Sequence, residues 1–535
     1  MPSCHLVSSA LFALPRSLMA LTAAFLLIAL PWLNPFAPSP TSSVGSLLVS
    51  WFCAALLLGL CAVVPQRLTG GPLVRAIVLG WLVAAAVSAV MGLVQYFGAT
   101  SMFGGWVNAA EVGLAYGNLR QRNQYATLMQ MGLLALLWWT MRHRVERAVP
   151  AVRWTLAQMA GSTPVLLALA VLLGAANAAS SSRTGLLQLV LVAGLVGLWG
   201  RWRERRVLYV MLAASAAYGL ALAALPWLAG LDPLTSGAWA RLRAGDAACS
   251  SRLTLWGNVL QLITLRPWLG WGWGELDYAH FITLYPGERF CGILDNAHNL
   301  PLHLTVVLGV PAALLLCGAA VWGVWRAEPW HETDATRQLA WGVLAVIGLH
   351  SLLEYPLWYG QFQVACVLCV WLLWRPVLAG EFKRFRALAL VGKAVVAIIL
   401  ITVLGWVAWD YHRVRQMYLP PAQRAEAFQT NTLAKVQGAW WFTGQVKFAE
   451  LTTTPLTPGN AAHMNALSRE LLHFSPEPRV IETLIDSAAL LGREDEVAFY
   501  TARYQAAFPE QYSRWVKGKP PGQRGDSPNL HLTFR

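Results

Sequence analysis

Long apolar stretches alternate with short polar connections along the chain, up to about residue 409. A helix needs about 20 predominantly apolar residues to cross the hydrocarbon core of a membrane, with some variation taken up by tilt. Eleven stretches meet this requirement, at about 17–33, 44–64, 76–97, 123–141, 155–173, 184–200, 207–228, 299–325, 338–354, 355–374 and 387–409. The first is short enough to resemble a signal peptide, but no small-residue cleavage site follows it, so we expect it to remain a helix. The pattern predicts an all-α fold, a polytopic membrane helix bundle with about eleven spans.

The pattern changes after residue 409, where shorter helix-forming stretches are separated by clusters of Pro, Gly and Thr. These stretches lie at about 421–450, 460–473, 477–491 and 494–507. Their length is typical of helices in a small soluble domain, whereas the last residues lack apolar periodicity, which is typical of disorder. We therefore expect a membrane domain at 1–409, a helical domain at 410–516 and a disordered tail at 517–535.

The composition supports this organisation. Apolar residues make up 56% of the 535 residues and charged residues only 12%, which leaves too little polar surface for several soluble domains. A net charge of +14 would point to nucleic acid in a soluble protein, but here Lys and Arg fall between the apolar stretches. There they orient helices against the anionic inner face of a membrane. We therefore expect membrane lipids, and no nucleic acid, among the partners.

Lys and Arg are distributed unevenly between alternate connections. Seventeen lie in one set of short connections and only three, Arg120, Arg122 and Arg183, in the other. Because basic connections stay in the cytoplasm, this asymmetry places the N-terminus inside the cell and, with an odd number of spans, the C-terminal domain outside. The other segments on the outer side are then 98–122, 174–183, 229–298 and 350–361.

Two of the eight cysteines stand in the large outer loop at 229–298. Disulfides form in oxidising compartments outside the cytoplasm. Cys249 and Cys291 are therefore predicted to form a disulfide, which the chain-entropy model values at about 4 kcal/mol. The cysteines within the spans are explained as buried apolar thiols.

Polar and ionisable residues inside or beside the spans collect on the outer side. Such groups are costly at membrane depth and usually mark a substrate path. A transporter is expected to place them near the midplane, between two related halves, whereas this sequence has no internal repeat. The asymmetry therefore favours a site at the outer surface over a transport pathway.

Five outer segments carry most of these polar groups. They are YGNLRQRNQYA (116–126), ASSSRTG (179–185), CSSRLTLWGNVLQLITLRPWLGWGWG (249–274), DNAHNLPLHLTVVLGVPA (295–312) and HSLLEYPLWY (350–359). In this order and on one side, they resemble the bacterial O-antigen ligase and polymerase superfamily, in particular its PglL-type protein O-oligosaccharyltransferases. The resemblance covers most of the chain. It implies transfer of a preassembled glycan from a polyprenyl-diphosphate carrier to a hydroxyl group, in the periplasm, by a protein of the bacterial inner membrane.

His298 begins an apolar stretch from the outer side and is followed by Asn299, with nine residues between Asn299 and Gly309. This spacing resembles a signature of the ligases, which then expects Gly, Thr or Tyr where this chain has Ala312. Because imidazole titrates near neutral pH, it can take the proton of an acceptor Ser or Thr hydroxyl. We therefore expect His298 to be the general base. Without the surrounding motif, it would be explained as a polar residue at a helix start.

Arg183 and Arg252 lie near the membrane surface in Ser-rich segments. A guanidinium keeps its charge and suits a diphosphate, whose negative charge grows as the glycosyl bond breaks. We therefore expect both to bind the leaving group, with contact to lipid headgroups as the alternative. Arg120, Gln121 and Arg122 stand at the start of a span, where they either extend the phosphate site or anchor the helix.

His350 and Glu354 share a helix face at i, i+4 near an outer helix end, where Pro356 supports a turn after Tyr355. They form either an imidazolium–carboxylate pair near the substrate or a purely structural clamp. Together with Asn299 and Tyr355, they complete the set of predicted substrate-binding residues.

Neither a metal nor a cofactor is expected. His303 lies about 140° around a helix from His298, so the two do not form a one-face zinc pair, and the outer acidic residues have no recognisable metal-binding spacing. The run from Gly270 to Gly274, GWGWG, lacks the preceding strand of a dinucleotide loop. Its glycines permit a tight turn, and its indoles either stack on sugar rings or lie at the membrane interface.

Taken with the resemblance, these residues predict an enzyme with residues 1–409 as its catalytic domain. It would transfer an oligosaccharide en bloc from undecaprenyl diphosphate to Ser or Thr hydroxyls of pilin-like or other periplasmic proteins, with inversion of configuration. The alternatives are an O-antigen ligase with a lipid A core acceptor, an O-antigen polymerase and, less favoured, a lipid-linked glycan flippase or other transporter. The size of the domain at 410–516 favours a protein acceptor, because a small sugar acceptor would not need such a surface.

Overall fold

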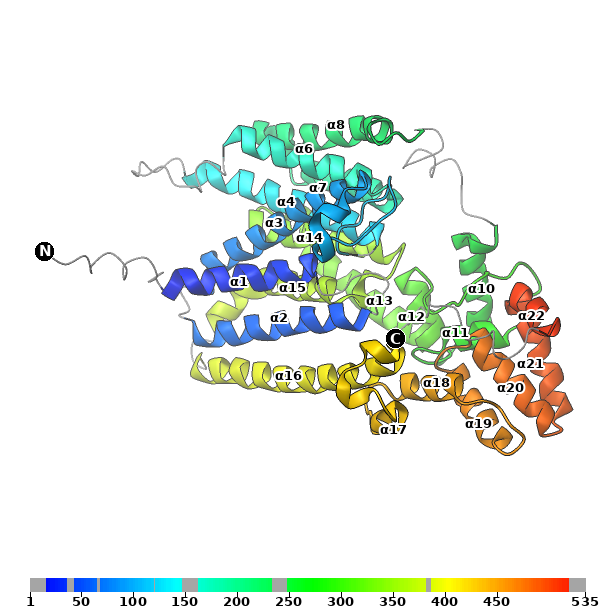
Figure 1. Cartoon of the computed structure of the whole chain (residues 1–535). Helices are drawn as coiled ribbons and strands as arrows, with labels where there is room; N and C mark the ends of the chain where they lie inside the picture. Colours follow the sequence, from blue (N-terminus) through cyan, green and yellow to red (C-terminus); the bar gives the residue numbers. More distant parts are fainter. Residues whose placement is uncertain are drawn as a thin grey trace, which may run out of the picture.

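The computed structural model of the chain describes residues 16–35, 43–64, 68–119, 121–146, 162–232, 248–381 and 386–518. Within these ranges all regular elements are helices (Figure 1). Arg120 and residues 519–535 of the predicted tail lie outside the described residues, so what we expect of them stays a prediction.

The helices that occupy the predicted spans form a bundle, in which the longer ones lie side by side with roughly parallel axes (Figure 1). They are α1 (Arg16–Leu33), α2 (Ser43–Val63), α3 (Gly71–Tyr96), α4 (Arg122–Glu146), α6 (Thr163–Ala179), α7 (Arg183–Leu198), α8 (Arg205–Leu228), α12 (Leu300–Leu308), α13 (Val310–Ala327), α14 (Ala335–Ser351), α15 (Gly360–Glu381) and α16 (Arg386–Arg415). Short 3-10 helices occur at η1 (Thr100–Trp106), η2 (Arg201–Arg203), η4 (Pro329–His331) and η5 (Pro356–Trp358). In the described ranges, five helical segments are long and apolar enough to cross a membrane, and four shorter ones are apolar. The predicted polytopic helical membrane bundle is confirmed.

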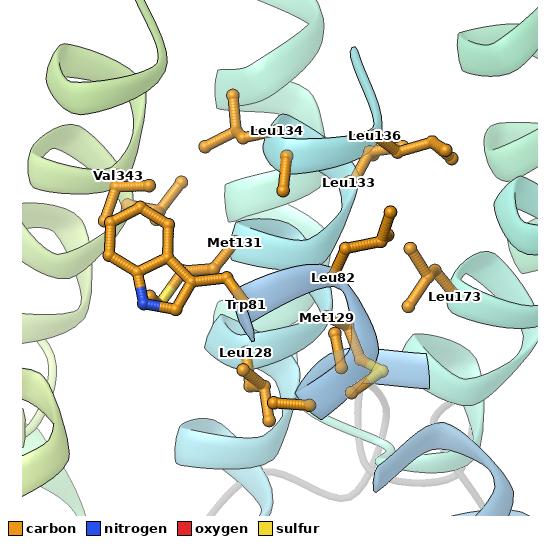
Figure 2. Close-up of a cluster of buried hydrophobic side chains, with 14 of the residues drawn as sticks. Trp81, Leu82, Leu128, Met129, Met131, Leu133, Leu134, Leu136, Leu173 and Val343 are labelled. Atoms are coloured by element: carbon orange, nitrogen blue, oxygen red, sulfur yellow. The ribbon is translucent and has the colours of Figure 1, made fainter. Parts of the chain in front are cut away.

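Helix α4 lies at the centre of the bundle. Side chains from α3, α6 and α14 surround its apolar residues, as Figure 2 shows for Trp81, Leu173 and Val343. Gly132 of α4 packs so closely on α3 that a Cβ there would lie 2.3 Å from the Cβ of Ala85, an approach that small residues permit between membrane helices. The neighbours on all sides fix α4, and with it the polar residues at its first turn.

The eighth predicted span is two helices, α12 and α13, rather than one. Gly309 separates them with a φ of +86°, a backbone conformation that glycine adopts without strain. The break frees carbonyl groups of α12, and those of Val306 and Val307 accept hydrogen bonds from the backbone N–H groups of Trp271 and Gly272, at 2.9 and 3.0 Å. The loop at 229–298 therefore satisfies the broken helix end, as helix termini require.

The described part of the outer loop folds into a compact unit with η3 (Ala248–Ser250), α10 (Arg252–Leu265) and α11 (Leu276–Ile282). This unit shares one apolar core with α12, formed by Leu255, Val259, Leu262, Leu276, Leu294, Val306 and Val307. A disulfide joins Cys249 to Cys291, whose Cα atoms lie 5.2 Å apart. Helix α12 thus packs with the loop unit and carries the residues at its first turn with it.

The chain beyond α16 forms shorter helices. They are η7 (Gln416–Tyr418), η8 (Pro421–Gln423), η9 (Glu426–Phe428), α17 (Thr432–Val436), α18 (Thr443–Thr453), α19 (Ala461–Leu472), α20 (Pro478–Leu490), α21 (Glu494–Ala507) and α22 (Pro509–Val516). The helix predicted at 421–450 is wrong in its length, because Pro421 and Gly438 divide this stretch into 3-10 turns and two separate helices.

The C-terminal helices contact the loop unit. Phe281 of α11 is buried in the core of α19, α20 and α21. Arg503 Nε donates to the carbonyl of Ile282 at 2.7 Å, and His473 Nδ1 lies 2.7 Å from Glu275 Oε2. The C-terminal helices therefore hold the segment that follows the Gly-Trp run of the loop, at one end of the bundle (Figure 1).

Candidate active site

Glu354 is the centre of a polar cluster at the end of the bundle that carries the loop unit. It lies in the turn after α14, and its side chain is only 9% exposed. Its Oε1 accepts from Arg252 Nη2 at 2.5 Å, and its Oε2 lies 2.7 Å from His298 Nδ1. The amide groups of Gln121 and Asn123 donate to it more weakly, at 3.4 and 3.3 Å. Residues from α4, the turn after α14, α10 and the start of α12 therefore meet at one carboxylate.

Two opposing effects act on the pKa of the Glu354 carboxyl. Burial by itself raises this pKa, while the hydrogen bond and charge of His298 and the charge and hydrogen bond of Arg252 lower it. The net result is a pKa below the ordinary value of 4.5. A carboxylate that accepts hydrogen bonds from charged partners stays ionised. Glu354 is therefore an anion that accepts hydrogen bonds from both His298 and Arg252.

His298 is held in an unusual backbone conformation, with a φ of +50°. This left-handed region is costly for a residue with a side chain and is found preferentially at functional sites. The conformation is fixed locally, because His298 N donates to Asn296 Oδ1 at 2.9 Å, and Asn299 caps α12 by accepting from Leu302 N at 3.1 Å. The imidazole is thereby aimed at Glu354.

The contact with Glu354 also determines the tautomer of neutral His298. An ionised carboxylate only accepts hydrogen bonds, so the proton of the neutral imidazole stays on Nδ1. The other nitrogen, Nε2, then carries the lone pair and can accept a proton. The side chain is 27% exposed, which leaves room for a substrate hydroxyl to approach.

Three arginines lie at helix starts around this cluster. Arg252 is the first residue of α10 and is 33% exposed; one of its N–H groups is engaged by Glu354. Arg122 is the first residue of α4, and its buried Nη1 has no hydrogen-bond partner in the described part of the chain. Arg183 is the first residue of α7 and is exposed. Cationic side chains at helix N-termini make an environment that favours an anion such as a phosphate group.

Asn123 and Ser182 join α4 to α7 beside the cluster. Ser182 Oγ donates to Asn123 Oδ1 at 2.6 Å and accepts from Gly185 N at 3.0 Å, which caps α7. Asn123 in turn donates to Glu354. Sequence reasoning missed both residues, although their neighbours Arg122 and Arg183 were among the candidates.

In the described part of the chain no hydrogen bond joins the side chains of His350 and Glu354, which the i, i+4 spacing had paired. Helix α14 ends at Ser351, so the side chain of Glu354 turns away to His298. His350 is fully buried, and its Nδ1 contacts Thr127 Oγ1 at 2.9 Å. No surface of His350 is accessible in this structure, which favours the structural role over the substrate-binding one, and both stay predictions.

Asn299 and Tyr355 lie beside His298 in different ways. Asn299 Nδ2 donates to the carbonyl of Leu352 at 3.1 Å, so both ends of its amide serve the backbone. The ring of Tyr355 stands edge-on to the His298 imidazole, with centroids 5.0 Å apart, and burial raises the pKa of its hydroxyl. Tyr355 therefore faces the site as a neutral aromatic wall.

A row of aromatic rings continues from Tyr355. Its centroid lies 6.4 Å from that of Trp358, and Trp358 stacks on Trp273 at 5.8 Å with an interplanar angle of 4°. The ring of His303 stands edge-on to both indoles. Among the described residues, no group of three or more His, Cys, Asp or Glu side chains is placed to hold a metal ion.

Fold and site define a polytopic helical membrane protein with an ionisable cluster at one end of its helices. Three family models match parts of the chain. Residues 167–317 match a model described as O-antigen ligase, residues 115–139 a protein glycosylation ligase, and residues 338–521 the C-terminal part of a virulence factor membrane-bound polymerase. The matched ranges contain Arg122, Arg183, Arg252, His298 and Glu354.

A curated relative is similar over a shorter stretch. It is the general O-oligosaccharyltransferase of Acinetobacter baylyi (strain ATCC 33305 / BD413 / ADP1), 28% identical over 117 residues. The aligned part is 22% of this chain and 20% of the relative, so the match spans about a fifth of that protein. Together with the three family models, each of which matches less than half of the chain, it makes the chain similar to O-antigen ligases and protein glycosylation ligases.

Proposed function

We propose that the protein transfers a preassembled oligosaccharide en bloc from undecaprenyl diphosphate to a Ser or Thr hydroxyl of a pilin-like or other periplasmic protein. The observation that carries this proposal is the contact of His298 Nδ1 with the Glu354 carboxylate, which itself holds Arg252. It supplies an oriented base and a cation within one cluster. The family supports glycosyl transfer as the reaction class.

In the proposed reaction, His298 is the general base. The acceptor hydroxyl attacks the anomeric carbon as its proton passes to His298 Nε2, and Glu354 stabilises the imidazolium that forms. The bond from the anomeric carbon to the acceptor oxygen forms while the bond to the phosphate oxygen breaks. Undecaprenyl diphosphate leaves with the bonding electron pair, and this single displacement inverts the anomeric configuration.

Arg252 and Arg122 would bind the departing diphosphate, with Arg183 at its edge. Negative charge develops on the leaving phosphate as the bond breaks, and preorganised guanidinium groups stabilise that charge without reorganisation. Arg122 stands at the first turn of α4, between Gln121 and Asn123, which both contact Glu354, and its Nη1 has no partner among the described residues.

The donor is expected in the outer leaflet of the bacterial inner membrane, because the basic connections favour an orientation with this end of the bundle in the periplasm. The C-terminal helices are attached to the loop unit that carries His298. This proximity supports a protein acceptor, which they would receive next to the site.

The experiment combines purified protein, an undecaprenyl-diphosphate oligosaccharide and a pilin-like acceptor, and measures the intact mass of the acceptor. The wild type should add the mass of the glycan, and His298→Ala should abolish the addition while retaining the melting temperature of the wild type. A folded His298→Ala protein with normal transfer would contradict the role of the base.

The same assay tests the polymerase alternative, which the match of residues 338–521 to a polymerase model makes worth keeping. In that case the acceptor mass stays constant and the donor lipid gains glycan repeats. If the donor lipid is extended, the acceptor is a lipid-linked glycan instead of a protein. The proposed roles of His298, Glu354 and Arg252 would then stay the same.

A further inference from the structure

The stacked pair of Trp273 and Trp358 has no part in the proposed reaction. Trp273 stacks on Trp358 at 5.8 Å and nevertheless keeps 63% of its surface exposed. Trp358 is itself 6.4 Å from Tyr355, whose ring touches His298. A continuous aromatic row therefore leads from the candidate base to an open indole.

The backbone fixes Trp273 in this position. Gly270, Gly272 and Gly274 all have positive φ angles, which lets the segment turn tightly. A Cβ at Gly270 would lie 2.5 Å from the carbonyl carbon of Val307, so the segment packs directly against the backbone of α12. Trp273 is thus part of a rigid surface and needs little ordering before it binds a ligand.

The neighbouring Trp268 offers a contrast within the same segment. It is 76% exposed and Leu269 is 85% exposed, and Trp268 makes no ring contact with any residue in the part of the chain that the structure describes. Isolated exposed apolar side chains of this kind are typical of membrane-interface anchors. Trp273, with its stacked partner and its link to the site, differs from an anchor.

The polar atoms along the row suit a ligand that is apolar on its faces and polar at its edges. His303 Nδ1 is buried without a hydrogen-bond partner among the described residues, and the ring stands edge-on to both indoles. A pyranose ring has such a character, because its C–H groups can lie on an aromatic face while its hydroxyls reach polar atoms at the rim.

We propose that Trp273, stacked on Trp358, is a subsite for a sugar residue of the donor glycan beyond the one that is transferred at its anomeric carbon. This inference rests on the proposed function. The first sugar lies next to His298, since its anomeric carbon reacts there. The rings of Tyr355 and Trp358 separate His298 from Trp273, so the open indole contacts a later sugar.

The test measures donor and acceptor kinetics for the wild type, Trp273→Ala, Trp273→Tyr and Trp268→Ala. Two donors are compared, undecaprenyl diphosphate carrying one sugar and the same lipid carrying an oligosaccharide that begins with that sugar. Trp273→Ala should raise KM about fivefold for the oligosaccharide donor and leave KM for the one-sugar donor unchanged, because only the longer glycan reaches the indole. Trp273→Tyr should restore most of the loss, and Trp268→Ala should match the wild type.

Other outcomes overturn the subsite. An equal loss in Trp273→Ala and Trp268→Ala would make both residues membrane anchors. If Trp273→Ala changes KM for the acceptor alone, the aromatic row binds the acceptor. If it changes KM equally for both donors, Trp273 acts on the first sugar instead of a later one.

A binding measurement without acceptor separates this inference from the proposed function. The wild type in nanodiscs should bind the oligosaccharide lipid more tightly than the one-sugar lipid, and Trp273→Ala should remove that difference. If glycan-length dependence is present but no acceptor protein gains mass, the subsite holds and the proposed acceptor fails. If transfer occurs without any dependence on Trp273, the proposed function holds and the subsite fails.

Discussion

Two clusters of Arg and Glu lie at opposite ends of the same pair of helices, α7 and α14. At the end away from the loop unit, Arg201 uses all three of its nitrogens: Nε to Gln338, Nη1 to Glu204 and Nη2 to the carbonyl of Thr333, at 3.0, 2.8 and 2.7 Å. At the other end, Arg252 uses one nitrogen, on Glu354, among the residues that the structure describes. The guanidinium of Arg201 is therefore saturated, whereas that of Arg252 has donors to spare.

The two clusters also differ in how completely their positive charges are matched by carboxylates. Arg201 and Arg337 are each matched by a glutamate, Glu204 and Glu332. Around Glu354, one carboxylate faces Arg252 and His298, with Arg122 nearby. A cluster whose charges and hydrogen bonds are complete within the protein stabilises the fold, whereas a cluster with excess positive charge and unused donors is prepared for an anion. We call these the saturated end and the open end.

The largest expected effect comes from Glu354→Gln, which removes the charge that orients His298 and holds Arg252. General-base catalysis contributes about 10²- to 10⁴-fold, so kcat should fall by at least about 100-fold in protein that remains folded at the assay temperature. The assay is glycan transfer to the acceptor, measured by intact mass over time.

The matched control at the saturated end is Glu332→Gln, which loses the contact with Arg337. Transfer should stay within about twofold of the wild type, because Glu332 lies outside the proposed active site, while the melting temperature falls. Loss of activity in the control without loss of stability would break the distinction between the two ends.

Replacement of Arg by Lys should give the second largest effect. Arg252→Lys keeps the charge but loses the planar fork that binds both Glu354 and a phosphate, so kcat/KM for the donor should fall about tenfold to 100-fold. Arg201→Lys at the saturated end should leave kcat/KM intact and destabilise the protein by about 1–3 kcal/mol, through its lost hydrogen bonds. Paired kinetics and thermal melts check both values, and the comparison would fail if the two variants behaved alike.

The stability contributed by Glu354 at the open end should depend on pH. The pKa of Glu354 is held below its ordinary 4.5, so its ionised form stabilises the folded state. This contribution is fully present above pH 4.5 and is lost as the pH falls through the folded-state pKa. The difference in melting temperature between the wild type and Glu354→Gln should therefore shrink below pH 4.5. A difference that stays constant from pH 6 to pH 3 would show that Glu354 makes no such contribution.

The smallest expected effects come from two glutamines. Gln121 reaches Glu354 only at 3.4 Å, so Gln121→Ala should lower kcat about twofold to threefold and leave the melting temperature unchanged. Gln338 accepts from Arg201 and donates to the carbonyl of Glu332 at 2.6 Å. Gln338→Ala should have the reverse profile, with normal transfer and a lower melting temperature. If the two variants changed transfer and melting temperature alike, the glutamines would not distinguish the open end from the saturated end.

The sequence was sufficient to predict the helix bundle, because a membrane span is determined by apolar length and needs no long-range information. It also drew attention to His298 and Arg252, since an ionisable group at the edge of an apolar stretch needs a reason to be there. The break at Gly309 had a signal that was overlooked: Pro311 follows it at the start of α13, and proline favours the first turn of a helix.

The partner of His298 was not predictable in the same way. The i, i+4 rule applies only within a continuous helix, and α14 ends at Ser351, before Glu354. The orientation of the Glu354 side chain then depends on where α10 and α12 dock, which is a tertiary contact. The stack of Trp273 on Trp358 joins segments 85 residues apart and is invisible to local pattern for the same reason.

The interruption at Gly309 divides the proposed active site between two separately packed units. Arg252 and His298 stand at the first turns of α10 and α12, which share the loop core, whereas Glu354 belongs to the bundle. The proposed base and its carboxylate therefore meet across a seam between separately packed units. A rigid shift of the loop unit, of the hinge or shear kind, would separate His298 from Glu354 without unfolding either unit. The His298–Glu354 contact therefore also reports whether the loop unit is docked on the bundle.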